Sequence, residues 1–172
     1  MDGVSIRPAR PGDAERLAAI YNQGIADRVA TFETRARTPA DTAEWLAGRL
    51  PVLVAERSGE VIGFARVSPY SDREAYAGVG EHAVYVDRAA RGAGTGRLLL
   101  EALADAGARL GLHKLTSRVF ADNPASLAVH RAAGFEAVGV QRRHGRLDGR
   151  WKDCVLVELL LGEASAEEPG SE

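Results

Sequence analysis

A glycine-rich segment near the middle of the chain has the residue types of an anion-binding loop. It runs Arg91-Gly92-Ala93-Gly94-Thr95-Gly96-Arg97, follows a strand-like run at Ala83–Val86 and leads into a helical pattern that extends to about Leu110. A glycine-rich turn that opens into a helix presents unpaired backbone N–H groups, and the helix dipole adds partial positive charge. Because the neighbouring arginines favour the same ligand, the sequence predicts a main-chain site for phosphate or pyrophosphate.

The spacing of these glycines excludes two common phosphate-binding motifs. A Walker A loop has Gly-Lys-Ser/Thr after its second glycine, whereas this chain has Gly96-Arg97-Leu98. A dinucleotide-binding loop has the spacing Gly-x-Gly-x-x-Gly, which Gly92-Ala93-Gly94-Thr95-Gly96 does not match. The pattern that remains is Arg/Gln-x-x-Gly-x-Gly after a strand.

Length, charge and cysteine content narrow the class of protein. A chain of 172 residues with a net charge of −2 predicts one domain, residues 1–162, without a basic surface for nucleic acid. Cys154 is the only cysteine, which excludes an internal disulfide and disfavours a cysteine-based metal site, so no metal is expected. Without a signal-peptide pattern or a membrane-spanning apolar run, we expect a cytoplasmic protein with no membrane contact. Residues 163–172 are expected to form a flexible acidic tail.

The helices and strands that must position the glycine-rich loop do not alternate regularly along the chain. Two helices and a run of strands come first, and alternating strands and helices follow. This order predicts an α+β fold with a mixed, mostly antiparallel central sheet flanked by helices. A polar loop at residues 68–80 is long enough to be functional, and a basic, glycine-containing loop is expected at residues 141–149. Apolar spacing predicts helices at residues 14–26, 39–50, 95–110 and 125–133, and strands at residues 4–7, 52–57, 61–67, 81–86, 114–120, 135–140 and 151–161.

With this loop after a strand, the sequence resembles the GCN5-related N-acetyltransferase (GNAT) superfamily. The later run Asn123–Phe135, which ends in Gly134-Phe135, resembles the second cofactor-contacting segment of that family. The resemblance extends from about Val4 to Leu161 and implies a single GNAT-like domain.

Within the superfamily the chain resembles the phosphinothricin acetyltransferases, a subgroup that includes arsinothricin and methionine sulfone/sulfoximine acetyltransferases. Several short segments carry this resemblance. They are Ile20–Gln23, Thr31–Glu33, Arg37–Pro39, Glu81–Val86, His144-Gly145 and Gly149–Asp153, together with Tyr70, Arg73 and Tyr76.

The resemblance implies that acetyl-coenzyme A is the cofactor. In the family, the glycine loop binds the pyrophosphate through backbone N–H groups, and the pantetheine arm pairs with the preceding strand. The side chains of that strand have the alternative role of core packing, so only their backbone is assigned. The implied cofactor-binding residues are Val84, Tyr85, Val86, Arg91, Gly92, Ala93, Gly94, Thr95, Gly96, Arg97, Asn123 and Ser126.

Two residues are implied to be catalytic, Glu81 and His130. Acetyl transfer needs a base that deprotonates the amine and an acid for the departing thiolate. Glu81 is the implied base, and its alternative role is a solvated carboxylate at a strand edge. His130 stands where many relatives have a tyrosine acid; it is a candidate acid, and its alternative role is a packing or cofactor-contact residue.

An anionic acceptor requires a cation in its pocket, and arginine binds oxyanions bidentately. The resemblance implies that Phe32, Arg73, Tyr76 and Glu81 bind the acceptor, while Arg73 could instead be a mobile loop charge. The chain departs from the subgroup at Ser71, where a lysine is common, and this weakens the assignment to phosphinothricin itself.

The leading hypothesis is an acetyl-coenzyme A-dependent N-acetyltransferase for the α-amine of a small anionic amino-acid analogue, such as phosphinothricin or arsinothricin. Methionine sulfone, methionine sulfoximine or another amino acid is the alternative acceptor. A non-catalytic acyl-coenzyme A-binding module is a second alternative, and acetylation of protein amines is a weaker one. The resemblance also implies a homodimer. The basic loop at residues 141–149 is either solvated or covers the substrate, and a dimer would allow it to do so from a neighbouring subunit.

Overall fold

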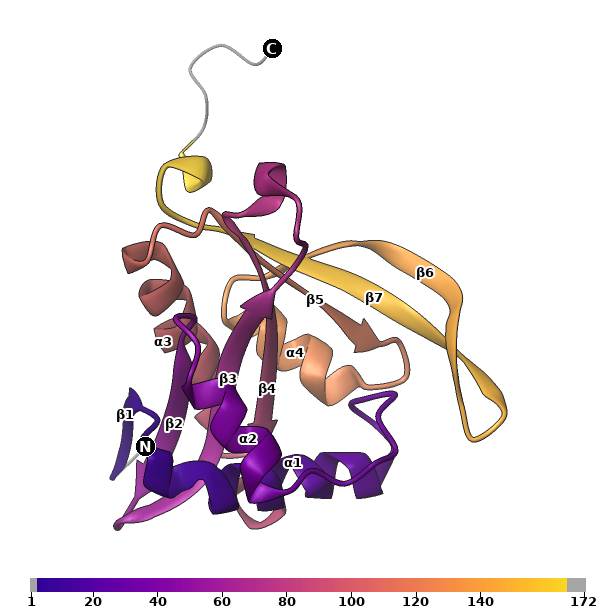
Figure 1. Cartoon of the computed structure of the whole chain (residues 1–172). Coiled ribbons are helices and arrows are strands. Elements are labelled where there is room, and N and C mark those ends of the chain that lie inside the picture. The colour runs from indigo at the N-terminus through magenta and orange to yellow at the C-terminus, as the bar shows by residue number, and fades with distance from the viewer. Residues whose placement is uncertain (1–2, 167–172) are drawn as a thin grey trace, which may run out of the picture.

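The structure, a computed structural model, describes residues 3–166. Its seven strands form one sheet in the order β1-β2-β3-β4-β5-β7-β6, and within this described sheet only β4 and β5 are parallel neighbours (Figure 1). The predicted α+β fold with a mixed, mostly antiparallel sheet is therefore confirmed. The strands are β1 (Val4–Pro8), β2 (Val52–Arg57), β3 (Glu60–Pro69), β4 (Val79–Val86), β5 (Lys114–Phe120), β6 (Glu136–Leu147) and β7 (Arg150–Leu160). The helices are α1 (Ala14–Asp27), α2 (Pro39–Leu46), α3 (Thr95–Arg109) and α4 (Pro124–Ala132).

Helices cover both faces of the sheet and divide the core into two layers. On one face, α1 packs its apolar stripe, which includes Leu17 and Ile20, against Phe64 of β3. On the other face, α3 packs Leu99 and Leu103 against strands β2 and β3. In this sheet β4 is the central strand (Figure 1).

The parallel pair β4 and β5 separates soon after it begins. Its register covers only Val79–Glu81 against Lys114–Thr116, and beyond this point the two strands diverge (Figure 1). On its other side β4 stays paired with β3 as far as Val86. The second half of β4 therefore presents one unpaired backbone edge inside the sheet, which is the feature that an extended ligand can use as an added strand.

The prediction of a loop at residues 141–149 is wrong, because most of these residues belong to a strand. β6 continues to Leu147 and forms a long hairpin with β7, which Figure 1 shows extending from the body of the molecule. The connection is Asp148-Gly149, and both residues have positive φ values, of 49° and 77°. An Asp-Gly pair of this kind favours a tight hairpin turn. A register shift between Gln141 and Gly145 absorbs the irregular residues.

The helix that follows Thr38 is shorter than expected. It starts as predicted, with a capping box in which the Thr38 side chain accepts from Asp41 N–H, but it ends at Leu46 and not near residue 50. Gly48 is a poor helix former, and Pro51 disfavours a helical backbone at the residue before it. The chain therefore leaves the helix early and turns into β2.

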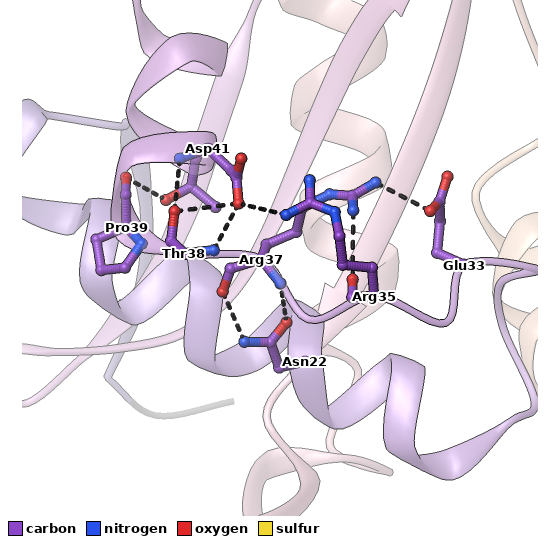
Figure 2. A network of polar contacts seen from close by, with 8 residues as sticks. Asn22, Glu33, Arg35, Arg37, Thr38, Pro39 and Asp41 are labelled. Atoms are coloured by element: carbon purple, nitrogen blue, oxygen red, sulfur yellow. Dashed lines mark hydrogen bonds and ion pairs between the residues drawn. The ribbon is translucent and has the colours of Figure 1, made fainter.

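The segment between α1 and α2, residues 28–38, has no regular structure but is anchored by side chains. Asn22 donates to the carbonyl oxygen of Arg37 at 2.9 Å and accepts from its N–H at 2.8 Å, as Figure 2 shows. Arg37 in turn forms an ion pair with Glu33 at 3.0 Å (Figure 2). These contacts hold the segment that carries Phe32 against the end of α1.

Residues 3–166 contain no helix that is long and apolar enough to cross a membrane. The same residues contain no group of three or more His, Cys, Asp or Glu side chains that could hold a metal ion. Of the expected tail at residues 163–172, Gly162–Ser165 form a single 3-10 turn, and residues 167–172 lie outside the described part of the chain.

Candidate functional site

Three adjoining cavities surround the diverging end of β4. The first, the gap cavity, lies between β4 and β5 and has a volume of about 70 Å³. The second, the glycine-loop cavity, has a volume of about 400 Å³ and is lined by Arg91, Gly92, Gly94, Thr95 and Gly96 with residues of α4. The third, the Glu81 cavity, has a volume of about 510 Å³ and is lined by Glu81, Arg66, Phe32, His144 and Arg118, among others.

The glycine-loop cavity has the backbone of an anion site. Gly92 and Gly94 have φ values of 79° and 81°, which side chains rarely tolerate, and Gly94 is the N-cap of α3 without a capping side chain. The first N–H groups of α3 are therefore free to bind an anion. The Thr95 hydroxyl is buried and has no hydrogen-bond partner among residues 3–166. Such an orphaned group fits a site that is completed by a polar ligand.

The arginines near this loop are not free charges. Arg88 and Arg91 both form ion pairs with Asp27 of α1, at 2.5 and 2.7 Å, and Arg97 pairs with Glu101 at 2.7 Å. These pairs are solvent-exposed and contribute little to stability. The backbone, more than the arginines, therefore gives the loop its affinity for anions.

The gap cavity exposes the unpaired edge of β4 opposite α4. Val84, Tyr85, Asn123, Ser126 and His130 are among its lining residues. Asn123 caps α4 through its side-chain oxygen, which accepts from Ser126 N–H at 3.1 Å, and its amide nitrogen donates to the Val29 carbonyl at 2.9 Å. Asn123 thus positions both α4 and the segment after α1 beside the gap.

A buried histidine pair links β4 to α4. The Nε2 atoms of His82 and His130 are 2.9 Å apart, and the two residues are only 2% and 4% exposed. His130 Nδ1 lies 2.8 Å from the Ser126 carbonyl oxygen, which can only accept, so Nδ1 carries the proton. His130 Nε2 then accepts from His82 Nε2–H, and His82 Nδ1 is left as a buried acceptor without a partner among the described residues.

Burial keeps both rings neutral. Desolvation, reinforced by the neighbouring His130, lowers the pKa of His82 to about 3, and desolvation also lowers the pKa of His130. The Thr116 backbone opposes the shift of the His82 pKa. In this arrangement both nitrogens of His130 are engaged, so a proton leaves the ring only if one of these contacts opens.

The Glu81 cavity is lined by two carboxylates, Glu81 and Glu33, and by two arginines, Arg66 and Arg118. Glu81 sits opposite Ser68 in the β3–β4 register, and its carboxylate lies 4.0 Å from the Arg118 guanidinium. The Glu81 side chain is 45% exposed, so solvent and ligands reach it. Phe32 forms part of the cavity wall, and its ring packs edge-on against Phe120 at the end of β5, with the centroids 4.8 Å apart.

The cavity wall at Phe32 is closely fitted to Gly145. A Cβ atom at position 145 would come within 2.6 Å of the Phe32 ring, so only glycine lets the hairpin approach this closely. His144, the neighbouring residue, also lines the cavity. The hairpin thus closes the Glu81 cavity from the same chain.

Arg73 and Tyr76 do not line any of the three cavities. Both are exposed, and the Arg73 guanidinium lies 5.6 Å from the centre of the Tyr76 ring. The remaining predicted site residues do lie at the cavities, apart from Ala93 and Arg97, which belong to the glycine loop and to the first turn of α3.

Sequence reasoning missed four residues of this region: Asp27, Arg66, His82 and Arg118. For Arg66 a signal was present. It interrupts an otherwise apolar strand, two residues from Ser68, and period-two alternation turns both toward the same face. The roles of the other three depend on contacts between distant segments, which no local pattern reveals.

Comparison with known proteins agrees with this arrangement. The model of the acetyltransferase (GNAT) family matches residues 18–135. The chain is 36% identical to an L-methionine sulfoximine/L-methionine sulfone acetyltransferase of Pseudomonas paraeruginosa, over 92% of this chain and 95% of the relative. It is also 36% identical to a phosphinothricin N-acetyltransferase of Streptomyces coelicolor, over 92% of this chain and 96% of the relative.

A solved structure extends the agreement to three dimensions. A GNAT superfamily phosphinothricin acetyltransferase from Sinorhizobium meliloti, in complex with acetyl-coenzyme A, superimposes with a TM-score of 0.88 at 32% identity. The match covers 98% of this chain and 94% of that one. Together with the glycine loop, the opened β4 edge and the adjoining cavities, these matches show that the chain belongs to the GNAT family and is an acetyl-coenzyme A-dependent N-acetyltransferase.

Proposed function

We propose that the enzyme acetylates the α-amine of a small amino-acid analogue that carries an anionic or strongly polar oxygen-bearing side group. Phosphinothricin and arsinothricin are the leading candidates, and methionine sulfone and sulfoximine are the alternatives. One observation carries the proposal: the gap cavity and the Glu81 cavity share a wall that includes Ala83, Tyr85 and Ser117. An acceptor beside Glu81 is therefore next to the strand edge along which the acyl donor would lie.

The chain's own groups fit acetyl-coenzyme A in two places. The free N–H groups after Gly94 and the orphaned Thr95 hydroxyl fit a pyrophosphate, and the unpaired backbone edge of Val84–Val86 fits the amides of an extended arm. When bound, acetyl-coenzyme A supplies a thioester as the acyl donor. Backbone N–H groups along the same edge are the candidate donors to the carbonyl oxygen as charge develops on it.

Proton transfer is assigned to the residues around this shared wall. Glu81 would accept a proton from the acceptor ammonium, directly or through one water molecule. His130 stays a candidate acid for the thiolate. To donate from Nδ1, its ring must exchange the Ser126 carbonyl for the sulfur.

A thiol-release assay tests the proposal with phosphinothricin, arsinothricin, methionine sulfone, methionine sulfoximine and a lysine-containing peptide as acceptors. We expect the free amino-acid analogues to be acetylated, and we expect no acetylation of the peptide. Binding of acetyl-coenzyme A without turnover of any amine would instead favour the non-catalytic binding module.

The role of Glu81 is tested by Glu81→Gln, which keeps the size of the side chain and removes the base. We expect kcat to fall about 100- to 10,000-fold, the usual contribution of general-base catalysis, while the Kd for acetyl-coenzyme A stays unchanged. Calorimetry measures that Kd in parallel. Unchanged turnover would remove Glu81 as the base.

Three further expectations stay predictions. We propose that Arg73 and Tyr76 contact the acceptor. This contact requires the exposed segment around residues 70–78 to move toward the Glu81 cavity. We propose that two copies associate through the β6–β7 hairpin, which exposes Val138, Val140 and Trp151. A cytoplasmic location is proposed from the sequence alone.

A further inference from the structure

Arg66 is a half-buried cation whose guanidinium forms no ion pair with the part of the chain that the structure describes. It projects from β3 into the Glu81 cavity and stacks on the Trp45 ring, 4.1 Å from the ring centroid. Among residues 3–166 no carboxylate lies within ion-pair distance of it. Most other arginines around the cavities do have such a partner: Arg37 has Glu33, Arg118 has Glu81, and Arg88 and Arg91 share Asp27.

Holding this charge in the cavity costs free energy. Burial lowers the pKa of Arg66, and the Arg37 cation acts in the same direction, while Tyr21, Tyr85 and the more distant Glu81 oppose the shift. An arginine nevertheless stays charged at neutral pH. A bound oxyanion would offset the desolvation, and a guanidinium that packs over an aromatic ring can still donate two parallel hydrogen bonds to such an anion.

The register of the sheet sets the distance from Arg66 to the base. Arg66 lies directly opposite Ala83, two residues along β4 from Glu81, and all three line the same cavity. Diagonal neighbours of this kind on one sheet face are about 7–8 Å apart. A single amino acid can therefore place its amine at Glu81 and one of its oxyanions at Arg66.

We propose that Arg66 is a specificity-determining residue that binds an oxyanion of the acceptor, either its α-carboxylate or its side-chain phosphinate or arsonate-type group. The inference rests on the proposed function and places an acceptor-binding residue on β3, separate from the contact proposed for Arg73. The Trp45 ring positions the guanidinium.

The test compares Arg66→Met, which keeps a long side chain against Trp45, with the wild-type enzyme and Arg66→Lys. The acceptors are phosphinothricin, methionine sulfone and methionine sulfone carboxamide, which lacks the α-carboxylate. If Arg66 binds the side-chain oxyanion, KM rises about 10- to 100-fold for phosphinothricin alone, as expected for a lost charge-assisted hydrogen bond. If Arg66 binds the α-carboxylate, KM rises for phosphinothricin and for methionine sulfone, which both carry this group, and not for the carboxamide.

Lysine restores the charge without the bidentate geometry, so Arg66→Lys is expected to recover part of the lost affinity. Arg109→Gln, an exposed change at the end of α3, is the matched control and leaves every KM unchanged. Thermal unfolding and the Kd for acetyl-coenzyme A check that Arg66→Met is folded. An unchanged KM for all acceptors, or an equal change that includes the carboxamide, overturns the proposal.

A calorimetric titration of phosphinothricin into enzyme without acetyl-coenzyme A separates this inference from the proposed function. Binding that is lost in Arg66→Met, without turnover by the wild type, supports Arg66 and contradicts the proposed activity. Turnover that does not depend on Arg66 supports the activity and contradicts this inference.

Discussion

Burial decides the ionisation state of the histidine pair between β4 and α4. His82 and His130 share one short contact, and each is almost fully covered. A ring that stays neutral in the folded state while it would be charged in the unfolded chain couples stability to pH. The pair therefore affects the enzyme beyond any part that His130 takes in proton transfer.

Because the pKa of His82 is lowered in the folded protein, we predict that the protein loses stability in mild acid. The unfolded chain protonates this ring below about pH 6.5, whereas the folded protein resists protonation down to about pH 3, so the free energy of unfolding falls as pH falls through this window. The ring contributes up to about 1.4 kcal/mol per pH unit. Urea unfolding at several pH values between 4.5 and 7.5 measures this slope, above the range where the carboxylates with lowered pKa values, such as Asp13 and Asp27, titrate.

The matched variant is His82→Gln, whose amide N–H can still donate to His130 but does not titrate. We expect a shallower dependence of unfolding free energy on pH in this variant. His130, whose pKa is also lowered, keeps a smaller slope of the same sign. An identical slope in wild type and variant would show that His82 is not protonated on unfolding.

Among the elements, the irregular segment between α1 and α2 has the most direct effect on the site. Thr31, Phe32 and Glu33 of this segment line the Glu81 cavity, yet the segment lacks backbone pairing of its own. Its position depends on Asn22 and on the Arg37–Glu33 ion pair, the contacts drawn in Figure 2. A cavity wall held by side chains is easier to loosen than one held by a strand.

Asn22→Ala tests this dependence. The change removes both hydrogen bonds to the Arg37 backbone, and we expect stability to fall by about 1–3 kcal/mol. The KM for the acceptor is expected to rise while the Kd for acetyl-coenzyme A is unchanged. Asn22→Asp keeps the acceptor and loses the donor, so an intermediate effect is expected. A lower melting temperature with an unchanged KM would limit Asn22 to a structural role.

At the scale of the whole molecule, the β6–β7 hairpin stands out because it exposes apolar side chains at an edge of the sheet. Val138 and Val140 are each more than half exposed, and so is Trp151, beneath the Arg146 guanidinium. Exposed edge strands with apolar residues pair readily with another chain. This surface is the basis for the proposed homodimer.

Val140→Lys tests the homodimer by placing a charge on the edge strand. Light scattering is expected to show a dimer for the wild type and a monomer for the variant. Leu110→Lys, at an exposed position just after α3, is the control and should leave the mass unchanged. A wild-type monomer at all concentrations would contradict the proposal.

Much of the fold and part of the site follow from local pattern. The glycines at 92 and 94, the capping box at Thr38 and the apolar periods of α1 and α3 each act within a few residues of the chain. The hairpin turn at Asp148-Gly149 has the same kind of local signal, because an Asp-Gly pair favours a tight turn between strands. Glu81 was found through the resemblance and its place at the start of the central strand.

By itself, the sequence determined the element order, the anion-binding glycine loop and the family resemblance, because backbone preference and apolar period are encoded locally. Only the tertiary structure decided where β4 and β5 separate and which side chains meet around the opening. The His82–His130 contact joins residues 48 apart in the chain, and register with β4 brings Arg66, in place of Arg73, into the cavity. Such convergence depends on strand pairing between distant segments, which no single stretch of sequence specifies.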